Sequence, residues 1–199
     1  MSTPADRLAT YGDLLALPED IRAEILAGAV VTAPSPLPGH SWAQRTLGGV
    51  IGFPFDNQHG RGGPGGWWIL PEVDIALGLH DIVRPDLAGW RRARLHHPGK
   101  NRPIEIAPDW VCELLSPSTA SRDRGYKRDL YARSNIGHYW VVDVELRLLE
   151  AFELRDGRWM LNGTYSDQDV ARIAPFAEIE LVIGDLFMPP ESDALPPAG

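Results

Sequence analysis

The stretch Trp110-Val111-Cys112-Glu113-Leu114-Leu115 decides how this sequence folds. Its apolar residues predict a strand over Val111–Leu115 that is buried at the centre of a sheet. A carboxylate inside such a strand is costly unless it is paired, hydrogen-bonded or bound to a metal. Glu113 is therefore either a structural partner of a neighbouring arginine or part of a functional site. Cys112 should face the opposite side of the strand as an inert core thiol.

Two further acidic residues stand at the ends of neighbouring predicted strands. Glu72 precedes a strand predicted over Val73–Leu77, and Asp86 follows Pro85 at the start of one over Asp86–Trp90. Carboxylates that converge from adjacent strands form a hard, oxygen-rich site, which suits magnesium or manganese better than zinc. We therefore take Glu72, Asp86 and Glu113 as candidate metal ligands.

A lysine follows these acids on a predicted helix. The helix runs from Ser118 or Thr119, either of which can cap it, to about Ser134, and it carries Lys127 four residues after Asp123. A lysine beside a bound metal can orient a water molecule and offset charge on a phosphoryl group. The alternative is a solvated lysine that is paired with Asp123. Hydroxyls such as Ser116 are expected to cap the helix rather than to bind phosphate.

The rest of the chain predicts a single α/β domain with a mixed sheet. Residues 1–9 are expected to be a flexible N-terminus, residues 10–188 the domain, and residues 189–199 a loose, proline-rich tail. The remaining predicted elements are helices over Thr10–Leu17 and His40–Phe53, strands at Trp67–Leu70 and His138–Val142, hairpins of Ala23–Leu26 with Ala29–Val31 and of Leu148–Leu154 with Arg158–Asn162, and short strands at Val170–Ile173 and Ile179–Val182.

Composition and charge narrow the functional class. The chain has 199 residues, a net charge of −8 and one cysteine. With no secretory signal and no apolar stretch near the roughly 18 residues of a membrane span, we expect a soluble cytoplasmic protein. The acidic balance argues against a protein that coats nucleic acid by bulk charge. Two locally basic segments are either ordinary surface charge or a polyanion-binding surface, for which the candidates are Arg84, Arg91, Arg92, Arg122 and Arg124.

Competing site motifs are weak. The glycine-rich segment 60–66 matches G-x-G-x-x-G, but the apolar stretch Trp67–Leu70 that follows reads as a strand rather than a helix, which argues against a dinucleotide site. The sequence contains no G-x-S-x-G elbow and no paired cysteines for zinc. His96 and His97 are expected at the surface, and His40 is expected to have a capping or structural role.

The order and spacing of several motifs together resemble one family. This is the Uma-type family, a bacterial group of restriction-endonuclease-like proteins described as a domain of unknown function, and the resemblance covers roughly residues 10 to 188. The motifs that carry it are Glu24-Ile25-Leu26-Ala27-Gly28, Pro34–His40, Leu70-Pro71-Glu72-Val73-Asp74, Val83-Arg84-Pro85-Asp86-Leu87, Val111–Thr119, Asp123-x-x-x-Lys127 and Gly137–Asp143.

The resemblance implies the PD-(D/E)XK nuclease fold, a mixed sheet flanked by helices with a divalent-metal site at one sheet edge. Pro85-Asp86 resembles the PD element and Glu113 the (D/E) position. Glu72 resembles an additional acidic residue of the site, and Glu24 a further one.

The lysine of the pattern departs from its usual place. Leu115 stands two residues after Glu113, where the pattern has lysine, and the resemblance implies that Lys127 on the following helix replaces it. We expect a Mg²⁺- or Mn²⁺-dependent endonuclease that hydrolyses DNA phosphodiester bonds. Asp86 and Glu113 would bind the metal with Glu72 as helper, and Lys127 would position the attacking water.

Two alternatives remain open. The first is a catalytically silent nuclease-fold module that binds nucleic acid or a protein partner, which the net charge and Leu115 favour. The second is a small-molecule phosphoesterase that uses the same carboxylates. The apolar strands after residue 138 and exposed aromatic residues such as Trp159 would support a homodimer.

Overall fold

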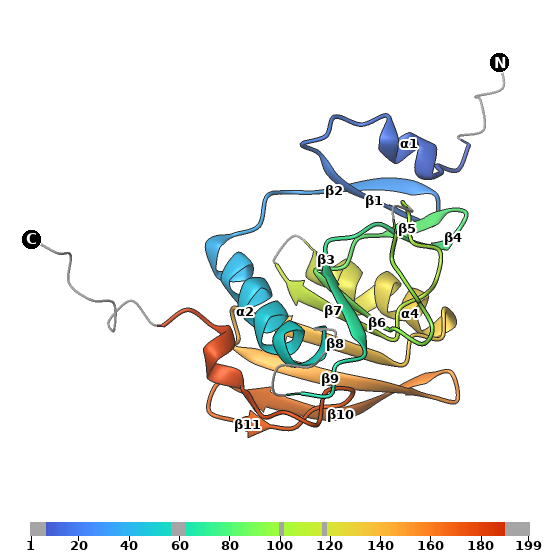
Figure 1. Cartoon of the computed structure of the whole chain (residues 1–199). Helices are drawn as coiled ribbons and strands as arrows, with labels where there is room; N and C mark the ends of the chain where they lie inside the picture. The colour runs from blue at the N-terminus through green and yellow to red at the C-terminus, as the bar shows by residue number, and fades with distance from the viewer. Residues whose placement is uncertain (1–6, 57–62, 100–101, 117–118, 190–199) are drawn as a thin grey trace, which may run out of the picture.

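The computed structural model describes residues 7–56, 63–99, 102–116 and 119–189. Its centre is a six-stranded sheet in the order β10-β9-β8-β7-β6-β3 (Figure 1). Only β7 and β8 pair in parallel within this sheet, so it is the mixed sheet that the sequence predicts. The strands are β3 (Trp67–Pro71), β6 (Leu87–Arg91), β7 (Trp110–Leu115), β8 (His138–Asp143), β9 (Leu148–Arg155) and β10 (Arg158–Ser166).

A second sheet, in the order β2-β1-β5-β4, stands beside the first (Figure 1). The predicted hairpin forms β1 (Arg22–Leu26) and β2 (Ala29–Ala33), preceded by α1 (Tyr11–Leu15). The strand predicted over Val73–Leu77 is shifted, because β4 spans Ile75–Gly78 and leaves Val73 and Asp74 outside it. The sequence prediction missed β5 (Asp81–Val83), which has only three residues and therefore carries no periodicity.

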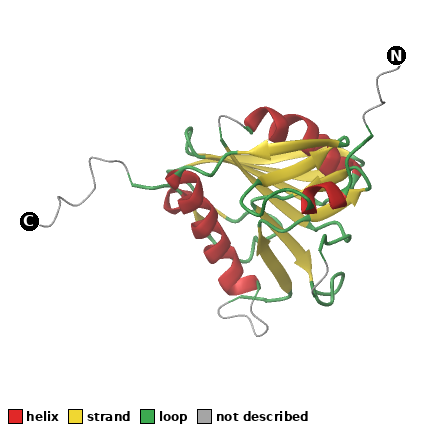
Figure 2. Cartoon of the chain, turned by 90° about the horizontal axis from the view of Figure 1, so that it is seen from above, coloured by secondary structure: helices red, strands yellow, loops and turns green. Residues whose placement is uncertain are grey.

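Helices cover both faces of the six-stranded sheet (Figure 2). α2 (Pro38–Phe55) is longer than predicted and buries Leu47, Ile51 and Phe55 in the same core as Trp110 and Cys112. The opposite face packs against α4 (Arg128–Arg133), whose Leu130 and Tyr131 lie in a second core with Val111 and Tyr139. The two faces of β7 therefore belong to different cores, and the expected core position of Cys112 is confirmed.

The helix predicted over 119–134 is broken into three pieces. These are α3 (Ala120–Arg122), a π-helical turn η1 (Asp123–Lys127) and α4. π-Helical turns often occur at functional sites, and here the turn buries both Asp123 and Lys127. Thr119 stands at the N-cap without a capping bond to the helix, and its hydroxyl instead lies 3.0 Å from that of Ser116. The alternative cap, Ser118, lies outside the described residues.

The structure also differs from the sequence predictions at Trp159 and in the strands near the C-terminus. Trp159 is half-buried rather than exposed, since its Nε1 donates to the carbonyl of Arg128 at 2.8 Å, so it gives no support to a homodimer. The predicted strands near the C-terminus shorten to β11 (Val170–Ala171) and β12 (Leu181–Val182), followed by the 3₁₀ helix η2 (Ile183–Leu186). Residues 60–62 and most of the expected tail lie outside the described residues. Within the described segments, no helix is both long and apolar enough to cross a membrane.

Candidate active site

A cavity of about 290 Å³ lies between the β1–β2 hairpin and the six-stranded sheet. The segment 34–37, the start of α2 and the residues that join β7 to η1 complete its wall. Charged side chains from widely separated parts of the sequence line it together: Arg22, Glu24, His40, Arg84, Asp86, Glu113, Arg122, Asp123 and Lys127. Asp86, Glu113 and Lys127, which the sequence analysis identified from separate motifs, therefore line the same cavity.

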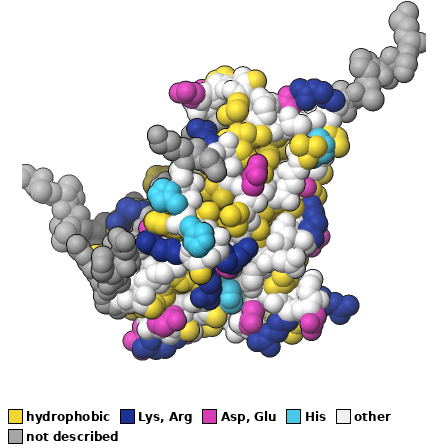
Figure 3. All heavy atoms as spheres, turned by 45° about the vertical axis from the view of Figure 1, so that its right-hand side comes forward, with side chains coloured by type: hydrophobic (Ala, Val, Ile, Leu, Met, Phe, Trp, Pro, Cys, Tyr) yellow, Lys and Arg dark blue, Asp and Glu magenta, His cyan; other side chains and the backbone are white. Residues whose placement is uncertain are grey.

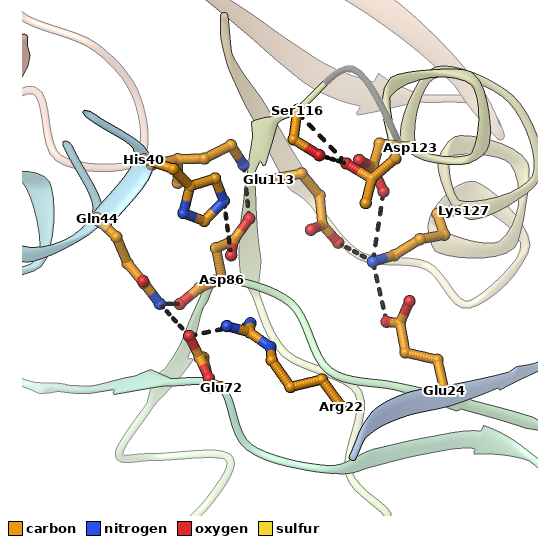
Figure 4. Close-up of polar contacts among 12 residues, drawn as sticks. Arg22, Glu24, His40, Gln44, Glu72, Asp86, Glu113, Ser116, Asp123 and Lys127 are labelled. Atoms are coloured by element: carbon orange, nitrogen blue, oxygen red, sulfur yellow. Dashed lines mark hydrogen bonds and ion pairs between the residues drawn. The ribbon is translucent and has the colours of Figure 1, made fainter. Parts of the chain in front are cut away.

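Asp86 is held at both carboxylate oxygens. It precedes β6, and its Oδ2 accepts the backbone N–H of Leu114 in the adjacent β7 at 2.8 Å. Its Oδ1 lies 3.2 Å from Nε2 of His40 (Figure 4). Burial lowers the pKa of His40, but the hydrogen bond and charge of Asp86 outweigh this and raise that pKa above its usual value. His40 therefore lies in the candidate site rather than serving only as a cap.

Glu113 is buried, with 3% of its surface exposed, although it contributes to the wall of the cavity. The hydroxyl of Tyr131 donates to Oε1 of Glu113, and Nζ of Lys127 lies 2.7 Å from the same oxygen. Burial raises the pKa of Glu113 well above its ordinary value. Lys127 opposes that shift, whereas the charges of Asp123, Asp86 and Glu24 add to it. Several carboxylates thus stand close to one lysine, in a cavity whose wall also carries Arg22, Arg84 and Arg122.

Lys127 is the cation at the centre of these acids (Figure 4). Its Nζ lies 2.7 Å from Glu113, 2.9 Å from Glu24 and 3.5 Å from Asp123. Burial lowers the pKa of Lys127, but these carboxylates outweigh burial and raise it well above the usual value, so the ammonium stays charged. The pairing with Asp123 that the sequence allowed is present, but the lysine is buried rather than solvated.

The donor set of the cavity suits a hard divalent cation. Asp86 and Glu113 come from adjacent strands, and their carboxylates point into the same space in Figure 4. Tyr131 and Lys127 both contact the same carboxylate oxygen of Glu113, Oε1. Among the described residues, no three His, Cys, Asp or Glu side chains form a ready-made metal site. The carboxylate oxygens of Asp86 and Glu113 are donors of the kind that Mg²⁺ and Mn²⁺ prefer, and Lys127 supplies a positive charge beside Glu113.

Glu72 lies beside the cavity rather than in its wall. Its Oε1 accepts from Nε2 of Gln44 at 3.1 Å and lies 3.0 Å from the guanidinium of Arg22. Its backbone has φ of 50°, a left-handed conformation that non-glycine residues adopt at some cost. Glu72, which the sequence predicts to assist the metal ligands, is therefore connected to Asp86 through Gln44, whose amide donates to both residues.

The candidate nucleic-acid-binding arginines separate into two groups. Arg84 and Arg122 line the cavity, together with Arg22, which the sequence prediction missed because no motif marks it. Arg91 and Arg92 lie at the opposite end of β6 from Asp86. Five residues at the rise of a strand place Arg91 about 16 Å from Asp86, and Arg92 follows it.

Ion pairs hold two of these arginines on other parts of the surface. Arg124 pairs with Glu150 at 2.6 Å, and Arg92 stacks on Trp68 and pairs with Asp56. On the face shown in Figure 3, basic side chains are interspersed with acidic ones.

Comparison with known proteins finds one matching family model and a solved structure with a similar fold. The model of the Uma2 family, described as "Putative restriction endonuclease", matches residues 8–184. A crystal structure of "a putative nuclease belonging to DUF820" from Anabaena variabilis is similar, with a TM-score of 0.70 and 23% identity. The match covers 90% of this chain and 97% of that one, and at this identity it shows the fold. No curated protein sequence matches the chain.

Proposed function

This chain belongs to the Uma2 family of "putative" restriction endonucleases, and from that premise we propose that it is a metal-dependent endonuclease that hydrolyses phosphodiester bonds in DNA. One observation carries the proposal. Carboxylates of adjacent strands, Asp86 and Glu113, line one cavity with a buried lysine. Burial of several carboxylates around one lysine is unfavourable for folding alone, and a bound cation would relieve their repulsion.

Asp86 and Glu113 would hold Mg²⁺ or Mn²⁺. When bound, such an ion supplies Lewis acidity to a phosphoryl oxygen and activates water. Lys127 keeps its ammonium beside Glu113, where its N–H groups can orient a water molecule or a phosphate oxygen. Its positive charge also offsets the charge that develops on the phosphoryl group.

Phosphate binding falls to the arginines of the cavity wall. Arg22, Arg84 and Arg122 line the same space as the carboxylates. Their guanidinium groups match phosphate geometry and would hold the backbone on either side of the scissile bond. In this proposal Glu72 helps indirectly, because it pairs with Arg22 and keeps that side chain at the cavity.

A second candidate is a phosphoesterase for small molecules. The observation that favours it is the size of the cavity, about 290 Å³, which is close to the lower end of the range for small-ligand pockets. A third candidate is a silent binding module, favoured by Leu115 at the usual lysine position and by the lack of a preformed three-ligand cluster among the described residues.

Nuclease assays separate these candidates. Purified protein is incubated with plasmid DNA, with oligonucleotides and with aryl phosphates, in Mg²⁺, in Mn²⁺ or in EDTA. The proposal predicts cleavage of DNA that requires the metal and is abolished in Asp86→Ala and Glu113→Gln, while both variants stay folded by circular dichroism. Cleavage of aryl phosphates alone would favour the small-molecule phosphoesterase, and equal cleavage in EDTA would exclude the proposed mechanism.

A further inference from the structure

We propose that helix α2 positions the carboxylate of Asp86 through His40 and Gln44, which act as positioning residues of the site. This inference builds on the proposed function, in which Asp86 holds the metal. His40 and Gln44 are four residues apart, so they lie on the same face of the helix. In Figure 4 both side chains extend from α2 toward Asp86.

The two side chains hold different parts of Asp86. Nε2 of His40 lies 3.2 Å from Oδ1, and an imidazole that carries a hydrogen on Nε2 donates to this carboxylate oxygen. Nε2 of Gln44 donates to the backbone carbonyl of Asp86 at 3.0 Å. The side chain and the main chain of Asp86 are therefore both tied to one helix.

The remaining oxygen of Asp86 is tied to the strand of the other candidate ligand. Oδ2 accepts the N–H of Leu114, the residue next to Glu113. The backbone register pairs Leu87 with Cys112 and fixes how the two strands are offset. With His40 on one oxygen and Leu114 on the other, the carboxylate has little freedom to rotate. Its spacing from Glu113 is then set before any cation binds.

The core holds the helix in place on the sheet. Leu47, Ile51 and Phe55 anchor it in the core, and Gly48 allows a close approach, since a Cβ there would lie 3.3 Å from the side chain of Leu87. Gln44 is itself anchored, because its amide also donates to Glu72 at 3.1 Å. The left-handed backbone of Glu72 directs that carboxylate between Gln44 and Arg22, which gives the strained residue a role.

A purely space-filling role does not account for His40. The residue is 9% exposed, and its Nδ1 has no hydrogen-bond partner among the described residues. Buried polar atoms are normally paired, and leaving one unpaired is unfavourable. A phenylalanine would fill the same space without that penalty. The contact with Asp86 is what the imidazole supplies and phenylalanine cannot.

Calorimetric titration of metal-free protein with Mn²⁺ tests the inference. His40→Phe and Gln44→Leu should each weaken Mn²⁺ binding 10–100-fold, as the loss of groups that orient metal ligands does. His40→Gln, which retains an N–H donor, should recover part of the affinity. Arg45→Ala, an exposed neighbour on the same helix, is the matched control and should bind as wild type does. Thermal melts establish that each variant is folded at the temperature of the titration.

Folded His40→Phe and Gln44→Leu with wild-type Mn²⁺ affinity would overturn the inference. If wild-type protein itself binds no Mn²⁺, the proposed function fails, and a metal-free measurement then decides about the positioning contact. In ¹⁵N NMR spectra without metal, Asp86→Asn should shift the Nε2–H resonance of His40, whereas Asp109→Asn at a distant ion pair should not. A His40 resonance that is unchanged in Asp86→Asn would overturn the inference.

Discussion

Nζ of Lys127 lies 2.7 Å from Oε1 of Glu113, and both residues are 3% exposed. One buried ammonium therefore stands among several carboxylates, since Glu24 and Asp123 contact the same nitrogen. Buried ion pairs of this kind contribute little net stability, because desolvation offsets their attraction. The energetic consequences of the arrangement can be measured without any knowledge of the substrate.

Removal of the ammonium should destabilise the metal-free protein. Lys127→Met leaves Glu24, Glu113 and Asp123 without their cation, and breaking a buried pair from one side costs about 3–5 kcal/mol. Urea denaturation in EDTA measures this change in the free energy of unfolding. The double variant Lys127→Met/Glu113→Gln should recover part of the loss, because it also removes a buried negative charge. A loss below about 1 kcal/mol in the single variant would mean that the cation is not needed.

The raised pKa of Glu113 predicts how stability depends on pH. Above the ordinary value of 4.5, the folded state retains a proton that the unfolded state releases. The free energy of unfolding should therefore fall as the pH rises from 4.5 through the raised pKa of Glu113. Urea denaturation in EDTA between pH 5 and pH 8 should show this decline, and Glu113→Gln should make it shallower. If the free energy of unfolding fell equally with pH in the wild type and in Glu113→Gln, a raised pKa of Glu113 would be contradicted.

Two buried tyrosines allow a matched comparison. The hydroxyl of Tyr131 donates to the carboxylate of Glu113, whereas that of Tyr139 donates to the neutral carbonyl of Asp123 at 3.0 Å. Hydrogen bonds to charged groups contribute about 1.5–3 kcal/mol and neutral ones about 0.5–1.5 kcal/mol. Above the raised pKa of Glu113, where the acceptor is charged, Tyr131→Phe should therefore lower the free energy of unfolding more than Tyr139→Phe. An equal or smaller loss in Tyr131→Phe across the whole pH range would contradict a hydrogen bond from Tyr131 to an ionised Glu113.

The arginines of the cavity wall should contribute more to DNA binding than those at the far end of β6. Arg22→Ala and Arg122→Ala should each weaken binding and reduce the salt dependence of the binding constant by about one unit of slope. Arg91→Ala, about 16 Å along the strand, is the comparison. Fluorescence anisotropy with labelled DNA over a salt series in Ca²⁺ gives the slopes. Equal effects at positions 22 and 91 would point to a binding surface beyond the cavity.

The sequence predicts secondary structure and burial correctly where the local pattern of apolar residues determines them. The apolar run around Glu113 predicts β7 and its burial, and the alternation places Cys112 in the opposite core. The helix containing His40 is also predicted, and it forms despite Gly48, Gly49 and Gly52, because Leu47 and Ile51 anchor it in the core. The order of motifs identifies the family, and the structure confirms the mixed sheet flanked by helices.

Contacts between distant segments could not be predicted in the same way. Nothing local to His40 indicates that its ring reaches Asp86, and nothing around Arg22 indicates that it joins the cavity. The π-helical turn that buries Lys127 interrupts a segment whose pattern predicts one continuous helix, so the sequence does not reveal it. The position of Glu72 beside the cavity likewise follows from its pairing with Arg22 and Gln44.

Anomalous diffraction from a crystal soaked in Mn²⁺ tests the central claim most directly. The account predicts a peak inside the cavity, about 2.0–2.2 Å from a carboxylate oxygen of Asp86 and from one of Glu113, as direct ligation of a small hard cation requires. It also predicts that the peak disappears in Asp86→Asn. An empty cavity at millimolar Mn²⁺, with Lys127 still bound to Glu113, would contradict it.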